Sequence, residues 1–202
     1  MTHDGDLMDS VIREYRAEDE KEWLRCHAFV YFDSNERRLL RKKPRYMGKS
    51  IELIALIDKK IIGFLDIERE EKPGGICYKK ADGNGMLWDI GVLPKFRREG
   101  VATRLLAEGI KRGKRLGMKR LEAWSIEQDA WKFYEKYGFK KFFEYHHVLI
   151  DSREKLKVFD KDDMHIVEIY AHVMPNADLK AIMARYRPKE VMPCRGFELT
   201  LR

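Results

Sequence analysis

A polar turn between an apolar strand and an apolar helix constrains the fold of this 202-residue chain more than any other feature. The strand is the run MLWDIGVL at 86–93, which Pro94 closes. The helix follows at 101–116, where apolar residues recur at helical spacing: Val101, Leu105, Leu106 and Ile110. A second strand, RLEAWSI at 120–126, comes next. A strand, a helix and a strand in this order predict a βαβ unit with two parallel strands.

Further strands and helices are expected on both sides of this unit. The other strands are expected at 10–15, 51–58, 59–70, 141–150 and 164–174. Two more helices are expected at 16–32 and 129–137. A short helix at 177–186 and a strand, FELTL, at 197–201 end the chain. This order of elements predicts an α/β or α+β fold with a mixed sheet.

Composition excludes several classes of protein. Hydrophobic residues make up 44% of the chain, which is enough for a packed core and too many for wholesale disorder. No apolar run approaches the ~20 residues that a transmembrane helix needs, so we expect no membrane partner. The start, MTHDGDLMDS, is acidic and polar, unlike a secretory signal peptide. We therefore expect a soluble protein of the cytoplasm.

Cysteines and histidines do not form a metal-binding pattern. The three cysteines lie far apart and include no CxxC pair: Cys26, Cys77 and Cys194. This spacing fits a reducing compartment and argues against a disulfide framework or a zinc site. Four histidines lack HxH or HxxxH spacing: His146, His147, His165 and His172. We expect them to be structural and expect no metal.

The turn RREGVA at 97–102 has the properties of an anion site. The first N–H groups of a helix lack intrahelical partners, and the helix dipole adds partial positive charge there. Gly100 has no Cβ, so the backbone can approach a ligand closely. Arg97 and Arg98 add positive charge, and Thr103 adds a hydroxyl. An ordinary loop is the alternative, because neither GxGxxG nor GxxxxGK[ST] is present.

Two motifs together resemble the GNAT N-acetyltransferase superfamily. The stretch DIGVLPKFRREGVATRLL resembles its acetyl-coenzyme A site, where [RQ]xxGx[GA] follows a strand that ends near a proline. DAWKFYEKYGF at 129–139 resembles a helix of the family, and IREYRAEDEKEW and IALIDKKIIGFLDIE resemble its first strand and central hairpin. The resemblance covers roughly 10–175. It implies a mixed, mostly antiparallel central sheet of about six to seven strands flanked by helices. Residues 176–202 would form a C-terminal extension that packs on the same domain or on a partner subunit.

The resemblance implies acetyl-CoA as a co-substrate. In this family the N–H groups of the turn hold the pyrophosphate, and the preceding strand bonds the pantetheine arm through main-chain groups. The residues implied for these contacts are Ile90, Val92, Arg97, Arg98, Glu99, Gly100, Val101, Ala102 and Thr103. Relatives often carry asparagine where this chain has Glu127, so we expect Glu127 to contribute to the cofactor site in a different way.

The resemblance also implies two catalytic residues. Tyr134 corresponds to a tyrosine often proposed as the general acid for the departing thiolate, and a buried core aromatic is the alternative. Asp89 is the candidate base for the incoming ammonium, directly or through water, and a structural partner for an arginine is the alternative. Glu68 is a further candidate base. With Asp66 and Glu70 it shares one strand face, which is either an acceptor site for a cation or, more ordinarily, a solvated face.

The expected reaction is direct acetyl transfer to a primary amine within a ternary complex. No cysteine lies near either motif, which argues against a covalent acyl-enzyme. The amine belongs to a small molecule or to a protein. Tyr31, Phe32, Asp33 and the basic segment 36–49 fall where the family builds its acceptor side, and such a basic run is usually a solvated surface.

Other functions and partners stay open at this stage. The formal net charge of +7 is compatible with a non-catalytic acyl-CoA sensor or a basic nucleic-acid-associated module. No zinc-finger, homeodomain or RRM motif is visible, which disfavours nucleic acid as a partner. FELTL is a candidate edge strand, and an exposed edge would allow a homodimer.

Overall fold

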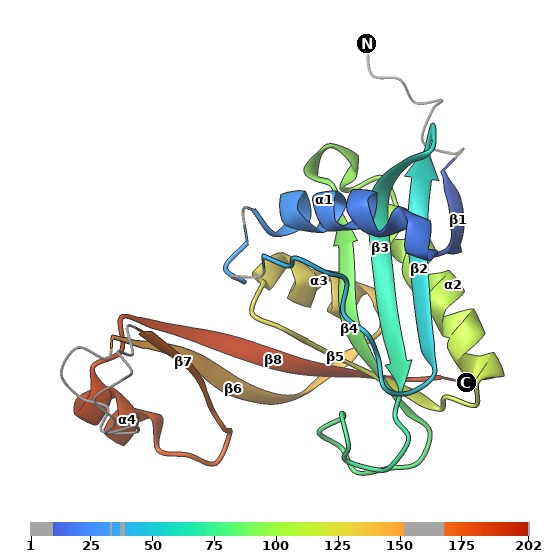
Figure 1. The fold of residues 1–202 in the computed structure, drawn as a ribbon. Coiled ribbons are helices and arrows are strands. Elements are labelled where there is room, and N and C mark those ends of the chain that lie inside the picture. The colour runs from blue at the N-terminus through green and yellow to red at the C-terminus, as the bar shows by residue number, and fades with distance from the viewer. Residues whose placement is uncertain (1–9, 33, 37–38, 152–167, 202) are drawn as a thin grey trace.

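Eight strands form one sheet in the computed structural model, which describes residues 10–32, 34–36, 39–151 and 168–201 (Figure 1). The strands are β1 (Val11–Glu14), β2 (Ser50–Ile57), β3 (Lys60–Arg69), β4 (Asn84–Val92), β5 (Arg120–Ser125), β6 (Lys140–Asp151), β7 (Glu168–Val173) and β8 (Glu190–Thr200). The helices are α1 (Glu20–Tyr31), α2 (Val101–Arg115), α3 (Gln128–Tyr137) and α4 (Leu179–Tyr186), with 3-10 turns at Ala17–Asp19 and Pro94–Phe96.

The sheet is mixed, as predicted. Its order is β1-β2-β3-β4-β5-β8-β6-β7, and only β4 and β5 pair in parallel. The parallel pair flanks α2, so the predicted βαβ unit is confirmed. The tight turn between β2 and β3 places Asp58 and Lys59 at φ 49° and 65°, the left-handed geometry that two-residue hairpins favour.

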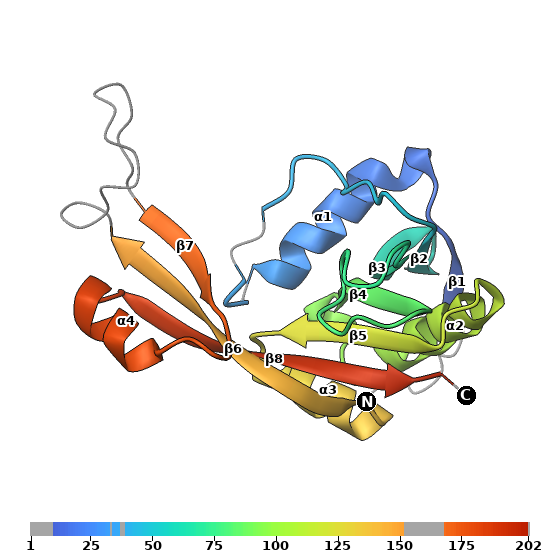
Figure 2. The same cartoon turned by 90° about the horizontal axis from the view of Figure 1, so that it is seen from below.

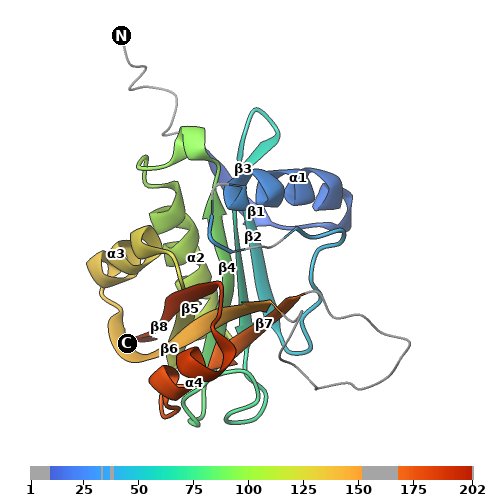
Figure 3. The ribbon, with the colours of Figure 1, turned by 90° about the vertical axis from the view of Figure 1, so that its left-hand side faces the viewer.

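Helices cover the two faces of the sheet unequally. Helices α2 and α3 lie on one face and α1 lies on the other (Figure 3). On the first face, Leu105 and Leu106 of α2 are fully buried in the larger core. On the second face, Trp23 of α1 packs against Phe64 of β3 with ring centroids 5.2 Å apart. The sheet is therefore the middle layer of the domain, and residues on both of its faces are buried.

Strands β4 and β5 separate part-way along their length. They pair only over Asn84–Leu87 and Arg120–Ala123. At that point the β3–β4 register shifts: Asp66 pairs with Asp89 while Ile67 pairs with Leu87, which makes Trp88 an extra residue. Such a bulge bends its strand and increases the local twist. The bulge therefore gives a physical reason for the separation of β4 from β5.

Strand β8 is not a peripheral extension. It lies between β5 and β6 and pairs with both, Phe197 with Ala123 on one side and with Lys141 on the other. The sequence therefore led to two wrong expectations. The sheet has eight strands rather than six or seven, and FELTL is not an edge strand. Sequence periodicity does not reveal which strand pairs with which, so this insertion could not be predicted.

The outer ends of β6 and β8 extend beyond the helices and form an arm with β7 and α4 (Figure 2). Strand β7 is an edge of the sheet, and β1 is the other. Ile182 and Tyr186 of α4 pack against Val148 and Ile150 of β6. Residues 164–167 of the predicted strand 164–174 lie outside the described residues. None of the helices in the described ranges is long and apolar enough to cross a membrane.

The central position of β8 predicts that Gly196→Ala destabilises the protein. Gly196 pairs with Phe143, and a Cβ at Gly196 would lie 1.9 Å from Cε1 of that ring. Elsewhere in a strand, alanine is favoured over glycine by roughly 0.5–1 kcal/mol. Here we expect a loss of about 1–3 kcal/mol in the free energy of unfolding, measured by urea denaturation.

A double-mutant cycle separates this clash from a general effect on the strand. In a Phe143→Ala background the ring is absent, so Gly196→Ala should cost less than about 0.5 kcal/mol. Equal losses in the two backgrounds would contradict the packing of Phe143 on Gly196.

Candidate active site

Main-chain groups of β4 face the space where β4 and β5 separate. The Leu93 N–H donates to the Ile62 carbonyl at 2.9 Å, so this residue directs its main-chain groups toward β3. Alternation along an antiparallel strand then directs those of Ile90 and Val92 away from β3, to the side of β5. Arg97 Nε donates to the Val92 carbonyl at 3.1 Å, which agrees with this direction. The orientation suits the predicted pantetheine contacts, whose role stays a prediction.

The turn from Arg98 to Thr103 presents unpaired N–H groups. Arg98 and Gly100 have φ of 69° and 80°, both left-handed, and α2 begins directly afterwards. None of the backbone N–H groups of residues 98–103 donates a hydrogen bond to another residue of the described ranges. Alternating left-handed and right-handed residues direct successive N–H groups into one concavity, and the start of a helix adds partial positive charge. The turn has the chemistry of a phosphate site.

Arg97 has a different role from its neighbours in the motif. Its guanidinium donates to the Val92 carbonyl of β4 and, at 3.2 Å, to the Val30 carbonyl near the end of α1. These two bonds tie the turn to β4 and to α1. The Glu99 side chain is exposed. The Arg97 side chain, although predicted for the cofactor site, therefore makes its hydrogen bonds within the protein.

Asp89 is buried beneath α1. Tyr31 donates its hydroxyl hydrogen to Oδ1, and His27 Nε2 lies 3.4 Å from Oδ2. Only 3% of Asp89 is exposed, and His27 is equally inaccessible at 1%. Both partners come from one face of α1, because they are four residues apart. The candidate base is therefore bonded by Tyr31 of α1 and lies beside His27 of the same helix.

The acidic row on β3 is buried, which corrects the expectation of a solvated face. Asp66, Glu68 and Glu70 are each at most 5% exposed. Glu68 accepts from the Trp88 indole and from the Gly48 N–H, each at 2.7 Å. These carboxylates hold neighbouring segments in place instead of facing water.

Lys43 neutralises this region. Its ammonium lies 2.7 Å from Asp66 and 2.8 Å from Glu52, with the rings of Tyr15, Trp23 and Tyr46 around it at 4.7–5.2 Å. Burial raises the pKa of Asp66 to about 7, although the Lys43 ammonium acts in the opposite direction. One member of the predicted solvated basic run is therefore a buried structural cation.

Tyr134 lies inside the core and close to Asp89. Its ring packs against Phe139 and Phe197, with centroids 5.2 and 5.4 Å away. Burial raises the pKa of the Tyr134 hydroxyl, and the nearby Glu36, Asp89 and Cys194 raise it further. A tyrosine in this environment keeps its proton at neutral pH. Its role as a general acid stays a prediction.

Glu127 connects the two sides of this site. It precedes the first residue of α3, and its carboxylate accepts from the Asn35 N–H at 2.6 Å and from the Asn35 side chain at 3.4 Å. Asn35 follows α1, in a segment that continues to Glu36. Glu127 therefore fixes the segment after α1 against the start of α3, and a contact with cofactor stays a prediction.

A family model for the acetyltransferase (GNAT) family matches residues 8–139, more than half of the chain. The chain belongs to the GNAT acetyltransferase family. It is therefore an acyltransferase by family. No curated protein matches this acetyltransferase.

Solved structures at low sequence identity share the acetyltransferase fold. A GNAT-family acetyltransferase from Streptococcus pneumoniae has a TM-score of 0.62 at 15% identity, covering 96% of this chain and 100% of its own. An N-acetyltransferase from Staphylococcus aureus Mu50 has a TM-score of 0.59 at 15% identity, covering 96% and 99%. The PaiA N-acetyltransferase of Thermoplasma acidophilum, solved with coenzyme A, has a TM-score of 0.50 at 18% identity, covering 67% and 92%.

Two buried residues of this acetyltransferase, His27 and Lys43, were not predicted from the sequence. His27 could have been found from its spacing, because it lies one helical turn before Tyr31, which was already placed on the acceptor side. Nothing in the sequence distinguishes Lys43 from the exposed Lys42 beside it. Its burial depends on long-range packing of 39–49 against the sheet.

The histidines of the arm form a local cluster. His147 and His172 stack with ring centroids 4.2 Å apart, and the Tyr145 and Tyr170 hydroxyls bond the His147 nitrogens. Burial lowers the pKa of His147 to about 4, and the neighbouring His172 lowers it further. Within the described ranges no three histidine, cysteine or acidic side chains are placed to hold a metal, and His165 lies outside them.

The buried ion pair of Lys43 predicts a large stability difference between adjacent lysines. Lys43→Met leaves Asp66 and Glu52 without their cation, and removing one partner of a buried pair costs about 3–5 kcal/mol. Lys42→Met, at an exposed site, should change the free energy of unfolding by less than about 0.5 kcal/mol. Urea denaturation of both variants measures the difference. A loss below about 1 kcal/mol for Lys43→Met would show that the pair is not structural.

Proposed function

We propose that this acetyltransferase transfers the acetyl group of acetyl-CoA directly to a primary amine, with both substrates bound at the same time. The observation that carries the proposal is the set of unpaired N–H groups at 98–103, in the turn that follows the strand that separates from β5. The residues present fit the pyrophosphate of coenzyme A, because oriented N–H groups at a helix start bind anions. Main-chain groups of Ile90 and Val92 would hold the pantetheine arm.

In the proposed chemistry Asp89 accepts one proton and Tyr134 donates one. Asp89 receives a proton from the incoming ammonium, which leaves a neutral amine that attacks the thioester carbonyl. A main-chain N–H of β4 stabilises the oxyanion that forms. Tyr134 gives its proton to the departing sulfur of coenzyme A, and burial keeps that proton on Tyr134 until the step occurs.

Direct transfer is supported by the state of the three cysteines. All three are buried free thiols: Cys26, Cys77 and Cys194. Burial raises the pKa of each, to about 12 for Cys26 and Cys194. Because the thiolate is the nucleophilic form, these protonated thiols do not suit an acyl-enzyme. Intersecting lines in two-substrate kinetics would agree with direct transfer, and parallel lines would overturn it.

The acceptor we propose is an amine of a small molecule or of a protein, met in the cytoplasm. The buried carboxylate of Asp89 suits a substrate that arrives as a cation. Release of free thiol from acetyl-CoA can be screened with spermidine, an aminoglycoside, amino-acid amides and peptides with free N-termini. A homodimer also stays a prediction, which light scattering of the purified protein would test.

Gly100→Asp should abolish acetyl-CoA binding. A Cβ at Gly100 meets no atom within 4 Å, so the new carboxylate would project from the turn and repel phosphate. Like charges placed together cost several kcal/mol, so calorimetry should show an affinity at least about 100-fold weaker.

Gly117→Asp is the matched control. Gly117 follows the other end of α2, has φ of 78° against 80° for Gly100, and also has nothing within 4 Å of a Cβ. Both variants therefore carry the same backbone strain. Wild-type protein that does not bind acetyl-CoA, or equal losses in both variants, would overturn the proposed phosphate site.

Tyr134→Phe should lower kcat and leave acetyl-CoA affinity unchanged. Loss of a general acid lowers rates by about 10²–10⁴-fold. Tyr137→Phe, on the same helix but without a proposed role in the reaction, should change kcat less than about threefold.

The raised pKa of Tyr134 also fixes the sign of a pH effect. An acid works while protonated, so a pKa above the ordinary value of 10.0 keeps kcat from falling through loss of this proton below that pH. An alkaline fall in kcat centred below about pH 9 that disappears in Tyr134→Phe would contradict this assignment.

A further inference from the structure

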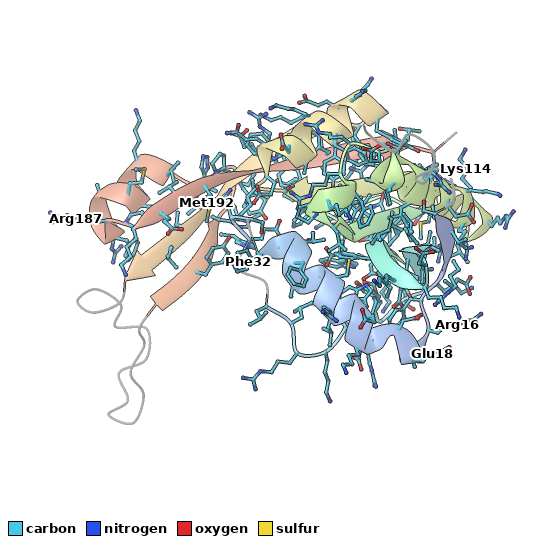
Figure 4. The ribbon with its side chains drawn as sticks, turned by 90° about the horizontal axis from the view of Figure 1, so that it is seen from above. Arg16, Glu18, Phe32, Lys114, Arg187 and Met192 are labelled. Atoms are coloured by element: carbon cyan, nitrogen blue, oxygen red, sulfur yellow. The ribbon has the colours of Figure 1, made fainter. Side chains whose placement is uncertain are left out.

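The bond between Tyr31 and Asp89 joins a half-buried side chain to a fully buried one. Asp89 is 3% exposed, whereas Tyr31 is half-buried and is the last residue of α1. Its neighbour Phe32 is 84% exposed and marks the end of α1 in Figure 4, on the side of the arm. The half-buried Tyr31 side chain therefore joins this end of α1 to the buried Asp89 carboxylate.

The bulge in β4 produces this arrangement. The extra residue Trp88 shifts the register so that Asp89 stands opposite Asp66, on the face of β3 that also bears Phe64. Helix α1 packs on that same face through Trp23. The carboxylate is thus directed under the helix, and its Oδ1 faces the Tyr31 hydroxyl.

We propose that Tyr31 is a catalytic residue that relays the proton of the acceptor amine to Asp89. The proposal rests on the proposed acetyl transfer. The Tyr31 oxygen takes a proton from the substrate ammonium while its own hydroxyl hydrogen moves to Asp89 Oδ1. One N–H bond and one O–H bond break, two O–H bonds form, and the amine is left neutral. The net change is one proton moved from substrate to carboxylate.

His27 is a positioning residue in this relay. Its ring lies between those of Trp23, Phe64 and Tyr31, with centroids 4.9, 5.5 and 4.5 Å away. Neither ring nitrogen has a hydrogen-bond partner within the described ranges, and Nε2 lies 3.4 Å from Asp89 Oδ2. The ring therefore packs against the tyrosine and places a polar edge beside the second carboxylate oxygen.

The relay predicts different outcomes for two similar tyrosines. Tyr46 donates its hydroxyl to Asp66 Oδ2 at 2.9 Å, and Asp66 is the strand partner of Asp89. Tyr31→Phe and Tyr46→Phe thus each remove one hydroxyl–carboxylate bond from the same region. Only Tyr31→Phe should lower kcat, by about 100-fold, with the KM for acetyl-CoA unchanged.

The solvent isotope effect adds a readout that a structural role would not change. Two protons move together in the relay, so kcat of the wild type should curve downward as the D₂O fraction rises. In Tyr31→Phe, where a water must carry the proton, kcat should depend on that fraction differently. Both measurements use acetyl-CoA with the amine that releases thiol fastest in the acceptor screen.

A pair of His27 variants tests the positioning role. Gln retains an N–H donor of similar reach, and Leu does not. His27→Leu should therefore lower kcat, whereas His27→Gln should retain at least about a tenth of the wild-type kcat. A tenfold loss corresponds to ~1.4 kcal/mol. Equal loss in both would overturn the role of the ring nitrogen.

The outcomes separate this relay from the proposed function. No thiol release with any amine would overturn the acetyl transfer itself. Thiol release that Asp89→Asn abolishes and Tyr31→Phe leaves intact would overturn the relay alone. Equal losses of kcat in Tyr31→Phe and Tyr46→Phe would also overturn it, because a general disturbance of the face beneath α1 would then explain both.

Discussion

The bulge at Trp88 is the constraint on which the rest of the site depends. It coincides with the last pair between β4 and β5, so the two strands separate where main-chain groups of β4 become available. The same shift of register directs Asp89 beneath α1. One extra residue therefore sets both the space between the strands and the position of the candidate base. A regular β4 would continue to pair with β5, and the side chain at position 89 would point to the other face.

Long-range polar contacts then hold the segments between α1 and β2 against this sheet and against α3. Lys43 joins 39–49 to β2 and β3 through two carboxylates, and Glu127 holds Asn35 at the start of α3. Buried pairs of this kind stabilise little compared with well-packed apolar residues, but they are costly to break on one side only. They therefore fix where the segment lies. This suits a surface that must present one geometry to a substrate.

The sequence predicted what is local and missed what is distant. The turn at 97–102, the helix after it and the motif around Tyr134 lie within short stretches, so spacing and composition predict them. The insertion of β8 between β5 and β6 depends on pairing between residues such as Phe143 and Gly196, which no periodicity encodes. The burial of Asp66 and Glu68 was missed for a related reason. Alternation shows that they share a face, but only the position of neighbouring segments shows whether water reaches it.

Arg97 connects the two halves of the proposed reaction. Its backbone begins the turn proposed to hold phosphate, and its guanidinium bonds Val92 at the end of β4 and Val30 in the last turn of α1. Val30 immediately precedes Tyr31, whose hydroxyl bonds Asp89. The turn and the end of α1 are therefore joined by one side chain. A displacement of the turn would reach the Tyr31–Asp89 bond through the hydrogen bond between Arg97 and Val30. Through this connection Arg97, the first residue of the motif, can affect the position of Tyr31 and Asp89 without contacting either substrate.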